Sequence, residues 1–164
     1  MPPNSIITTG GGFSTRVPRP QYQAAAVAQY LKTAPELPPL HDFASKNRAY
    51  PDCAALGNSF FVIIGGQAYD VSGTSCSAPV VAGMLTLVNN ARLNAGKPAV
   101  GFVNPAFYAA PKEVFNDITV GRNNCAAGGS VCCKHGFNAT VGFDPLTGLG
   151  SIKFDMMIEY LMKK

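Results

Sequence analysis

The sequence predicts an α/β fold in which helices accompany a mostly parallel sheet. Residues 60–64 (FFVII) form a continuous apolar run closed by Gly65 and Gly66, as expected of a strand buried on both faces of such a sheet. Residues 75–93 carry apolar side chains on one side at helical spacing, with Pro79 in the predicted first turn, and so indicate a buried helix. The strand and the helix that follows it set the fold class.

The remaining elements are shorter. Residues 5–9 are a β-branched run that ends in three glycines, which predicts a strand entering a tight loop. Apolar residues recur at helical spacing over 21–32 and 154–163, which predicts a surface helix and an amphipathic terminal helix. Residues 69–72 are expected to be extended, and 104–110 to form a short turn of helix before an irregular stretch rich in glycine, cysteine and asparagine.

Composition points to one domain, or a large piece of one. Apolar residues make up 47% of the 164 positions and charged residues 13%, with 17 glycines and 13 prolines, which describes a loop-rich globule and not a disordered chain. The net charge of +4 is dispersed, without a basic run, which argues against nucleic-acid binding. No apolar run reaches the roughly 20 residues that span a bilayer, and Met1 does not begin a signal-peptide pattern.

The cysteines suggest a secretory-pathway protein. The chain has five of them, namely Cys53, Cys76, Cys125, Cys132 and Cys133. The first two lie in apolar contexts and are interpreted as small core residues. The last three are bunched in a glycine-rich loop and indicate a disulfide, because a zinc site needs four ligands and His135 is the one histidine nearby. A glycosylation sequon at Asn138 points the same way.

A candidate nucleophile lies between an extended segment and a helix, in residues 72–79 (SGTSCSAP). A catalytic serine needs its hydroxyl at a fixed point, and a helix N-terminus adds free backbone N–H groups that can hold an oxyanion. Ser75, and not Ser72 or Ser77, is the predicted nucleophile. The alternative is that these hydroxyl residues only cap the helix.

This stretch resembles the nucleophile motif Gly-Thr-Ser-x-Ser/Ala-x-Pro of the subtilisin-like superfamily. Two more segments, 9–14 (TGGGFS) and 48–52 (RAYPD), and a Pro-x-Tyr-Gln pattern ending at Gln23, are similar to sedolisins, the serine-carboxyl peptidases. The resemblance covers nearly the whole chain and is closest to the tripeptidyl-peptidase branch. It implies a subtilisin-like three-layer fold, of which residues 1–164 form the C-terminal part of the catalytic domain. His41, the one histidine before Ser75, lies in no motif and is interpreted as a surface residue.

The resemblance also implies a calcium-binding loop at about 115–150. Calcium prefers six to eight oxygen ligands, both carboxylates and carbonyls. The implied ligands are the side chains of Asp117 and Asp144 and the carbonyls of Ile118, Thr140 and Gly142. A bridge from Cys125 to Cys132 or Cys133 would shorten this loop and leave a third cysteine to pair elsewhere. The alternative is that both aspartates cap turns.

The family mechanism, as the resemblance implies it, needs a glutamate base, an aspartate partner four residues away and an oxyanion aspartate, all before the glycine-rich loop. The glutamates of this chain are Glu36, Glu113 and Glu159. Glu113 and Asp117 have the right spacing, but they follow the nucleophile, and Asp117 belongs to the calcium segment. We therefore expect a fragment, a processed chain of a two-chain enzyme or a truncated gene product that is inactive alone.

The expected function is that of a calcium-dependent serine peptidase acting at acid pH, which releases tripeptides from peptide N-termini in a lysosomal or secreted acidic compartment. A carboxylate base suits this chemistry because it still accepts protons near about pH 4. The expected partners are peptide substrates and the N-terminal part of the same enzyme. The alternatives are a non-catalytic binding module that keeps the fold, and a fragment of a subtilisin-type endopeptidase.

Overall fold

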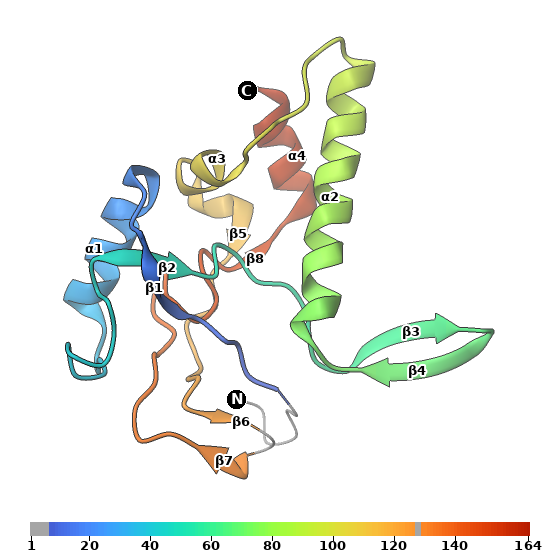
Figure 1. The fold of residues 1–164 in the computed structure, drawn as a ribbon. Coiled ribbons are helices and arrows are strands. Elements are labelled where there is room, and N and C mark those ends of the chain that lie inside the picture. The colour runs from blue at the N-terminus through green and yellow to red at the C-terminus, as the bar shows by residue number, and fades with distance from the viewer. Residues whose placement is uncertain (1–6, 127–128) are drawn as a thin grey trace.

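The computed structural model describes residues 7–126 and 129–164 (Figure 1). Its α-helices are α1 (Ala24–Thr33), α2 (Thr74–Asn94), α3 (Asn104–Tyr108) and α4 (Phe154–Met162), and two short 3-10 turns are η1 (Gln21–Gln23) and η2 (Lys112–Val114). Its strands are β1 (Gly12–Pro18), β2 (Asn47–Tyr50), β3 (Phe60–Ile64), β4 (Gln67–Val71), β5 (Phe115–Asn116), β6 (Cys125–Ala126), β7 (Val131–Cys132) and β8 (Ser151–Ile152). The mixture of helices and strands agrees with the predicted α/β class.

The strands of the described residues form antiparallel pairs, β1–β2, β3–β4, β5–β8 and β6–β7. A single isolated bridge, between Ala54 and Ser151, is parallel. The mostly parallel sheet of the prediction is therefore not seen within this part of the chain.

Three helical predictions are confirmed. Together η1 and α1 cover residues 21–33, and α1 ends just before Pro35, which cannot continue a helix. The predicted turn at 104–110 is α3, and the predicted terminal helix is α4. Over the described residues, none of the helices combines the length and the apolar character needed to cross a bilayer.

The long helix α2 exists as predicted, but its predicted burial is wrong for this chain. Its buried side chains are Val88 and Arg92, whereas Leu87 and Leu93 are 56% and 61% exposed. Figure 1 shows α4 beside α2 on one side. The contact with α4 therefore buries only part of the apolar surface of α2. Pro79 also lies in the second turn, because α2 begins at Thr74.

The strand β3 also differs from its prediction. Instead of a buried strand in a parallel sheet, it is one arm of an exposed hairpin with β4, which continues the extended piece expected at 69–72. The reason is the turn: Gly65 and Gly66 adopt φ values of 59° and 81°, the two positive angles that a tight hairpin requires. Figure 1 shows the hairpin projecting from the N-terminal end of α2.

The predicted strand at 5–9 is not supported where it can be seen. Residues 1–6 lie outside the described residues, and residues 7–9 form no strand. The strand β1 instead begins at Gly12 and pairs with β2, with Tyr50 opposite Gly12 and Asn47 opposite Pro18. Within the described residues, the glycine-rich loop therefore leads into a strand.

Two hydrophobic clusters hold the chain together. The first joins β1, α1, β2 and the loop at about residues 115–150, which we call the late loop. It consists of Phe13, Val27, Tyr30, Ala49, Phe137 and Phe143. The second joins α2, α3, η2, β5 and α4 and consists of Val88, Phe107, Val114, Phe115, Met157 and Leu161. Leu149 packs against both clusters, so the loop that contains it connects the two halves of the core.

Candidate functional site

Ser75 is the second residue of α2 and is exposed. Gly73 precedes the helix, and no side chain caps it, so the capping alternative for these hydroxyl residues is not supported. Ser72 and Ser77 both make side-chain hydrogen bonds to the segment 55–59, while the Ser75 hydroxyl makes none among the described residues. The one free hydroxyl of the three therefore stands at the positive end of a 21-residue helix.

A pocket of about 550 Å³ lies beside this turn. Its walls are the first turns of α2, the segment 51–55 and the late loop at Leu146, and most of the side chains are apolar. Cys53 is one of them, and burial raises the pKa of its thiol to about 11, with the nearby Asp52 charge adding to the effect. A thiol held in its neutral form acts as an apolar wall residue, in agreement with its interpretation as a packing residue.

Within the described residues, neither a carboxylate nor an imidazole is hydrogen-bonded to Ser75. His41 is 84% exposed and pairs with Asp42, as expected of a surface residue. Glu36 pairs with Arg122, and Glu159 pairs with Lys163. The candidate nucleophile thus has no base bonded to it in this part of the chain, and neither Glu113 nor Asp117 forms a hydrogen bond with it there.

Asp144 is a fully buried carboxylate held by donors from its own loop. Its Oδ1 accepts hydrogen bonds from the backbone N–H of Leu146 (3.0 Å) and from the backbone N–H and hydroxyl of Thr147 (2.7 and 3.0 Å). Its Oδ2 accepts one from the Thr140 N–H (3.0 Å). Burial raises the pKa of the Asp144 carboxyl despite these bonds, and among its described hydrogen-bond and ion-pair partners there is no cation.

Asp117 lies on the same loop as Asp144. Its Oδ2 accepts a hydrogen bond from the Gly142 N–H (2.7 Å), two residues from Thr140. The structure therefore brings both aspartates, Thr140 and Gly142 together, with Ile118 adjacent in sequence. The Thr140 hydroxyl is buried without a hydrogen-bond partner among the described residues. An unbalanced carboxylate and an unsatisfied oxygen are groups that a hard cation would complement, so these residues fit calcium.

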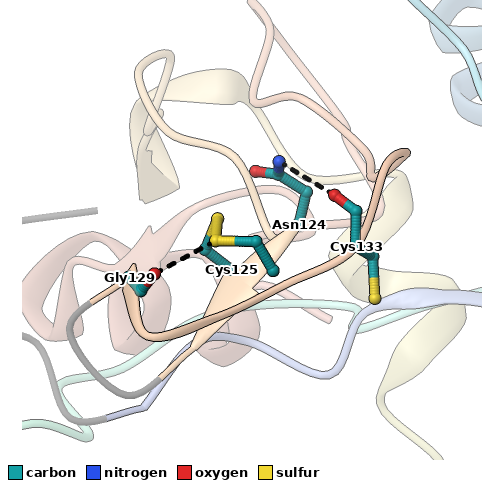
Figure 2. Close-up of a disulfide and its surroundings, with 5 residues drawn as sticks. Asn124, Cys125, Gly129 and Cys133 are labelled. Atoms are coloured by element: carbon teal, nitrogen blue, oxygen red, sulfur yellow. Dashed lines mark hydrogen bonds between the residues drawn. A yellow bond between two sulfur atoms is a disulfide. The ribbon is translucent and has the colours of Figure 1, made fainter.

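A disulfide closes the preceding part of this loop. Cys125 is bonded to Cys132 across the β6–β7 pair, one of the two pairings left open by the sequence (Figure 2). Cys133 is free and exposed, and its sulfur points away from the disulfide in Figure 2. No group of three or more cysteine, histidine or acidic side chains suited to a metal occurs in the described residues, which leaves the zinc alternative without support.

Comparison with known proteins decides the family. No protein-family model matches the chain. Physarolisin of Physarum polycephalum is 43% identical over 162 residues, and tripeptidyl-peptidase 1 of the dog, Canis lupus familiaris, is 40% identical over 156 residues; the matches cover 97% and 94% of this chain. A structure of Pseudomonas sedolisin, a serine-carboxyl proteinase complexed with two molecules of pseudo-iodotyrostatin, superposes with a TM-score of 0.67 at 25% identity, over 94% of this chain and 37% of that one. The chain belongs to the sedolisin family.

The matches cover nearly all of this chain but only part of each relative. The chain spans 28% of the length of the two curated relatives. The predicted likeness to the tripeptidyl peptidases is confirmed by the 40% identity.

The sedolisin motif at 48–52 organises a partly buried polar network. Asp52 accepts hydrogen bonds from Arg48 (2.5 Å), Asn104 (2.8 Å) and the Tyr108 hydroxyl (2.9 Å). Tyr108 in turn accepts one from Gln23 (2.7 Å), which also bonds the backbone of β2. These residues were not identified as partners from the sequence, because they come from three separate elements. The signal available was a charged residue and a glutamine, each placed in a recognised motif.

Proposed function

We propose that this sedolisin-family chain carries the nucleophile of a serine peptidase that acts on peptides at acid pH. The observation that supports it is the Ser75 hydroxyl, which is free among the described residues, at the N-terminus of α2 in a turn whose residues Thr74 and Ser77 line a pocket. In this proposal Ser75 attacks the scissile carbonyl, and the open N–H groups of the first turn of α2 help hold the oxyanion. Likeness to tripeptidyl-peptidase 1 supports release of tripeptides from peptide N-termini.

The proton of Ser75 needs an acceptor that the described residues do not place beside it. We propose that a further part of the catalytic domain supplies a glutamate base, its aspartate partner and an oxyanion aspartate. The exposed apolar surfaces support this. Both faces of the β3–β4 hairpin are apolar, with Phe61 and Ile63 on one face and Ile64, Tyr69 and Val71 on the other. A two-stranded hairpin of this kind is marginally stable unless other elements cover it.

The exposed apolar surface of the hairpin also indicates the architecture that we propose for the complete domain. A three-layer fold with a mostly parallel sheet would cover both faces of the hairpin and the open side of α2. The carboxylate base would suit an acidic compartment, lysosomal or secreted, and the disulfide Cys125–Cys132 suits the oxidising pathway that leads there.

We also propose that calcium binds at the late loop. Asp117 and Asp144 would supply carboxylate oxygens, and Ile118, Thr140 and Gly142 would supply carbonyls. Bound calcium would balance the buried charge of Asp144 and hold the loop in one conformation. At a concentration 100 times its dissociation constant it would add about 2.7 kcal/mol to the free energy of unfolding.

The calcium proposal is tested by thermal unfolding with and without a chelator. Chelation is expected to lower the Tm by about 5 to 10 °C, since a kcal/mol shifts a domain of this size by about 2 to 4 °C. Asp144→Asn should abolish this shift. Asp155→Asn, on the exposed start of α4, is the matched control and should keep it. An identical Tm with and without calcium in the unaltered chain refutes the site.

The peptidase proposal is tested by complementation. The chain is combined with the preceding region of the physarolisin catalytic domain and assayed at about pH 3.5 to 5 on a tripeptide-amide substrate. We expect no turnover from the chain alone, turnover from the complex, and its loss in Ser75→Ala. Thr86→Ala, which removes another exposed hydroxyl from α2, should stay active. A folded complex without turnover would instead favour a non-catalytic binding module, and turnover that survives Ser75→Ala would reject Ser75 as the nucleophile.

A further inference from the structure

Residues 55–59 run alongside the turn that carries Ser75 and are bonded to it on both sides. Before Ser75, the Gly73 N–H donates to the Gly57 carbonyl at 2.7 Å. After Ser75, the Ser77 hydroxyl lies 3.1 Å from two carbonyl oxygens, those of Ala55 and Leu56. Further out, the Ser59 N–H donates to the Ser72 hydroxyl at 3.0 Å. We call residues 55–59 the support segment.

The contact between Ser77 and the support segment is close enough to restrict the facing residue. A Cβ added to Gly57 would lie 2.7 Å from the Ser77 oxygen and 3.2 Å from the Gly73 carbonyl oxygen. Real Cβ atoms do not approach to 2.7 Å, so the hydroxyl and the glycine fit one another. Gly57 therefore packs against both Gly73 and Ser77, the residues on either side of Ser75.

The helix itself holds its first turns weakly. No side chain caps α2, and no acidic residue lies in its first turn. Pro79 has no N–H, so the Ser75 carbonyl lacks the hydrogen bond that the fourth following residue normally provides. The position of Ser75 then depends on contacts from outside the helix. On the C-terminal side of Ser75, such a contact is provided two residues away by the Ser77 hydroxyl.

We propose that Ser77 is a positioning residue for Ser75. Its hydroxyl fixes the start of α2 against the support segment, so that the nucleophile stays at one point relative to substrate and base. This inference rests on the proposed peptidase function. Ser77 itself does not touch the reacting atoms, and its hydroxyl proton is shared between the Ala55 and Leu56 carbonyls.

The first test needs no activity. Amide hydrogen exchange is measured at Gly73 and Cys76 in the full chain and in Ser77→Ala, with residues 88–92 of α2 as an internal reference. These two amides flank Ser75 and are hydrogen-bonded, to the Gly57 carbonyl at 2.7 Å and to the Gly73 carbonyl at 3.0 Å. We expect exchange at both to rise about 10-fold in the variant while the reference is unchanged, because the loss of the hydroxyl frees the first turn locally. Gly57→Ala, which pushes on the same contact from the other side, should give the same local pattern. Unchanged exchange at Gly73 and Cys76 in a folded Ser77→Ala chain overturns the proposal.

The second test uses the complemented enzyme. Ser77→Ala should lower kcat about 10- to 100-fold with KM nearly unchanged, as a misplaced nucleophile does. Ser77→Thr keeps the hydroxyl and should restore most of kcat, because Ser77 lines two pockets that leave room for a methyl group. A loss that Thr does not rescue, or that comes with a lowered Tm, shows a general structural role and rejects positioning. If the complex has no turnover at all, the peptidase proposal fails and the exchange result alone decides the role of Ser77.

Discussion

Removing the Tyr108 hydroxyl tests whether the Asp52 network stabilises the chain. Tyr108→Phe keeps the ring, whose contacts with Tyr22 and Phe143 have centroid distances of 5.4 and 5.8 Å. It removes the donor to Asp52 at 2.9 Å and the acceptor for Gln23 at 2.7 Å. The hydrogen bond to a carboxylate contributes about 1.5 to 3 kcal/mol, and the neutral one about 0.5 to 1.5. The expected loss in free energy of unfolding is therefore about 2 to 4 kcal/mol.

The assay is urea unfolding, with the slope m compared between variants so that a change in the unfolded state is recognised. Tyr160→Phe is the matched control, because its hydroxyl makes one neutral hydrogen bond, to the Ala106 carbonyl at 3.1 Å. It should cost about 0.5 to 1.5 kcal/mol. A double-mutant cycle of Tyr108→Phe with Asp52→Asn should show a coupling of about 1 kcal/mol or more. Equal losses in the two tyrosine variants, or a coupling near zero, would refute the network as a stabilising unit.

Other predictions concern the cysteines, the nucleophile and the buried arginine. At pH 8 a thiol reagent should modify exposed Cys133 first, while Cys53 reacts about 100-fold more slowly than an exposed thiol, because its pKa of about 11 against an ordinary 9.0 lowers the thiolate fraction by that factor. Ser75→Ala should change the free energy of unfolding by less than about 0.5 kcal/mol in the chain alone, since Ser75 is exposed and its hydroxyl has no hydrogen bond within the described part of the chain; a larger loss would show that it has a structural role. Arg92→Ala should cost about 2 to 4 kcal/mol in urea unfolding, because the buried guanidinium bonds the Leu161 carbonyl at the end of α4; a loss below 1 kcal/mol contradicts this anchoring.

Local patterns predicted the elements of this fold well, but not what covers them. The helical spacing in 21–32 and 154–163 and the stops at proline depend on neighbours in sequence, and both helices are found. The apolar run at 60–64 also forms its strand. Its continuous hydrophobicity indicates that both faces of the strand need cover, but not which element supplies it. Nor did the apolar run predict that Gly65 and Gly66 turn the chain back into a hairpin.

The site divides in the same way. The position of Ser75 at a helix start followed from adjacent residues, and the structure places it there. The partners of Asp52 could not be predicted, because Tyr108 lies 56 residues away and the contact depends on how α3 packs against η1. The role of Ser77 could not be predicted for the same reason, since its acceptors are the backbone carbonyls of Ala55 and Leu56, about 20 residues earlier, and neither residue has a polar side chain.

The residues that follow β2 connect the two halves of the candidate site through a short stretch of backbone. The Asp52 carbonyl accepts the Leu149 N–H at 3.0 Å, and the Ala54 N–H donates to the Gly150 carbonyl at 3.0 Å, so the late loop is bonded to this stretch. The next residues in the chain are the support segment, on which Ser77 rests. If calcium orders the late loop as proposed, the two backbone hydrogen bonds would also fix residues 52–54. The support segment follows these residues directly and contacts the turn that carries Ser75. Under that proposal, calcium would stabilise the position of Ser75 through the backbone, without contact between the metal and the reacting atoms.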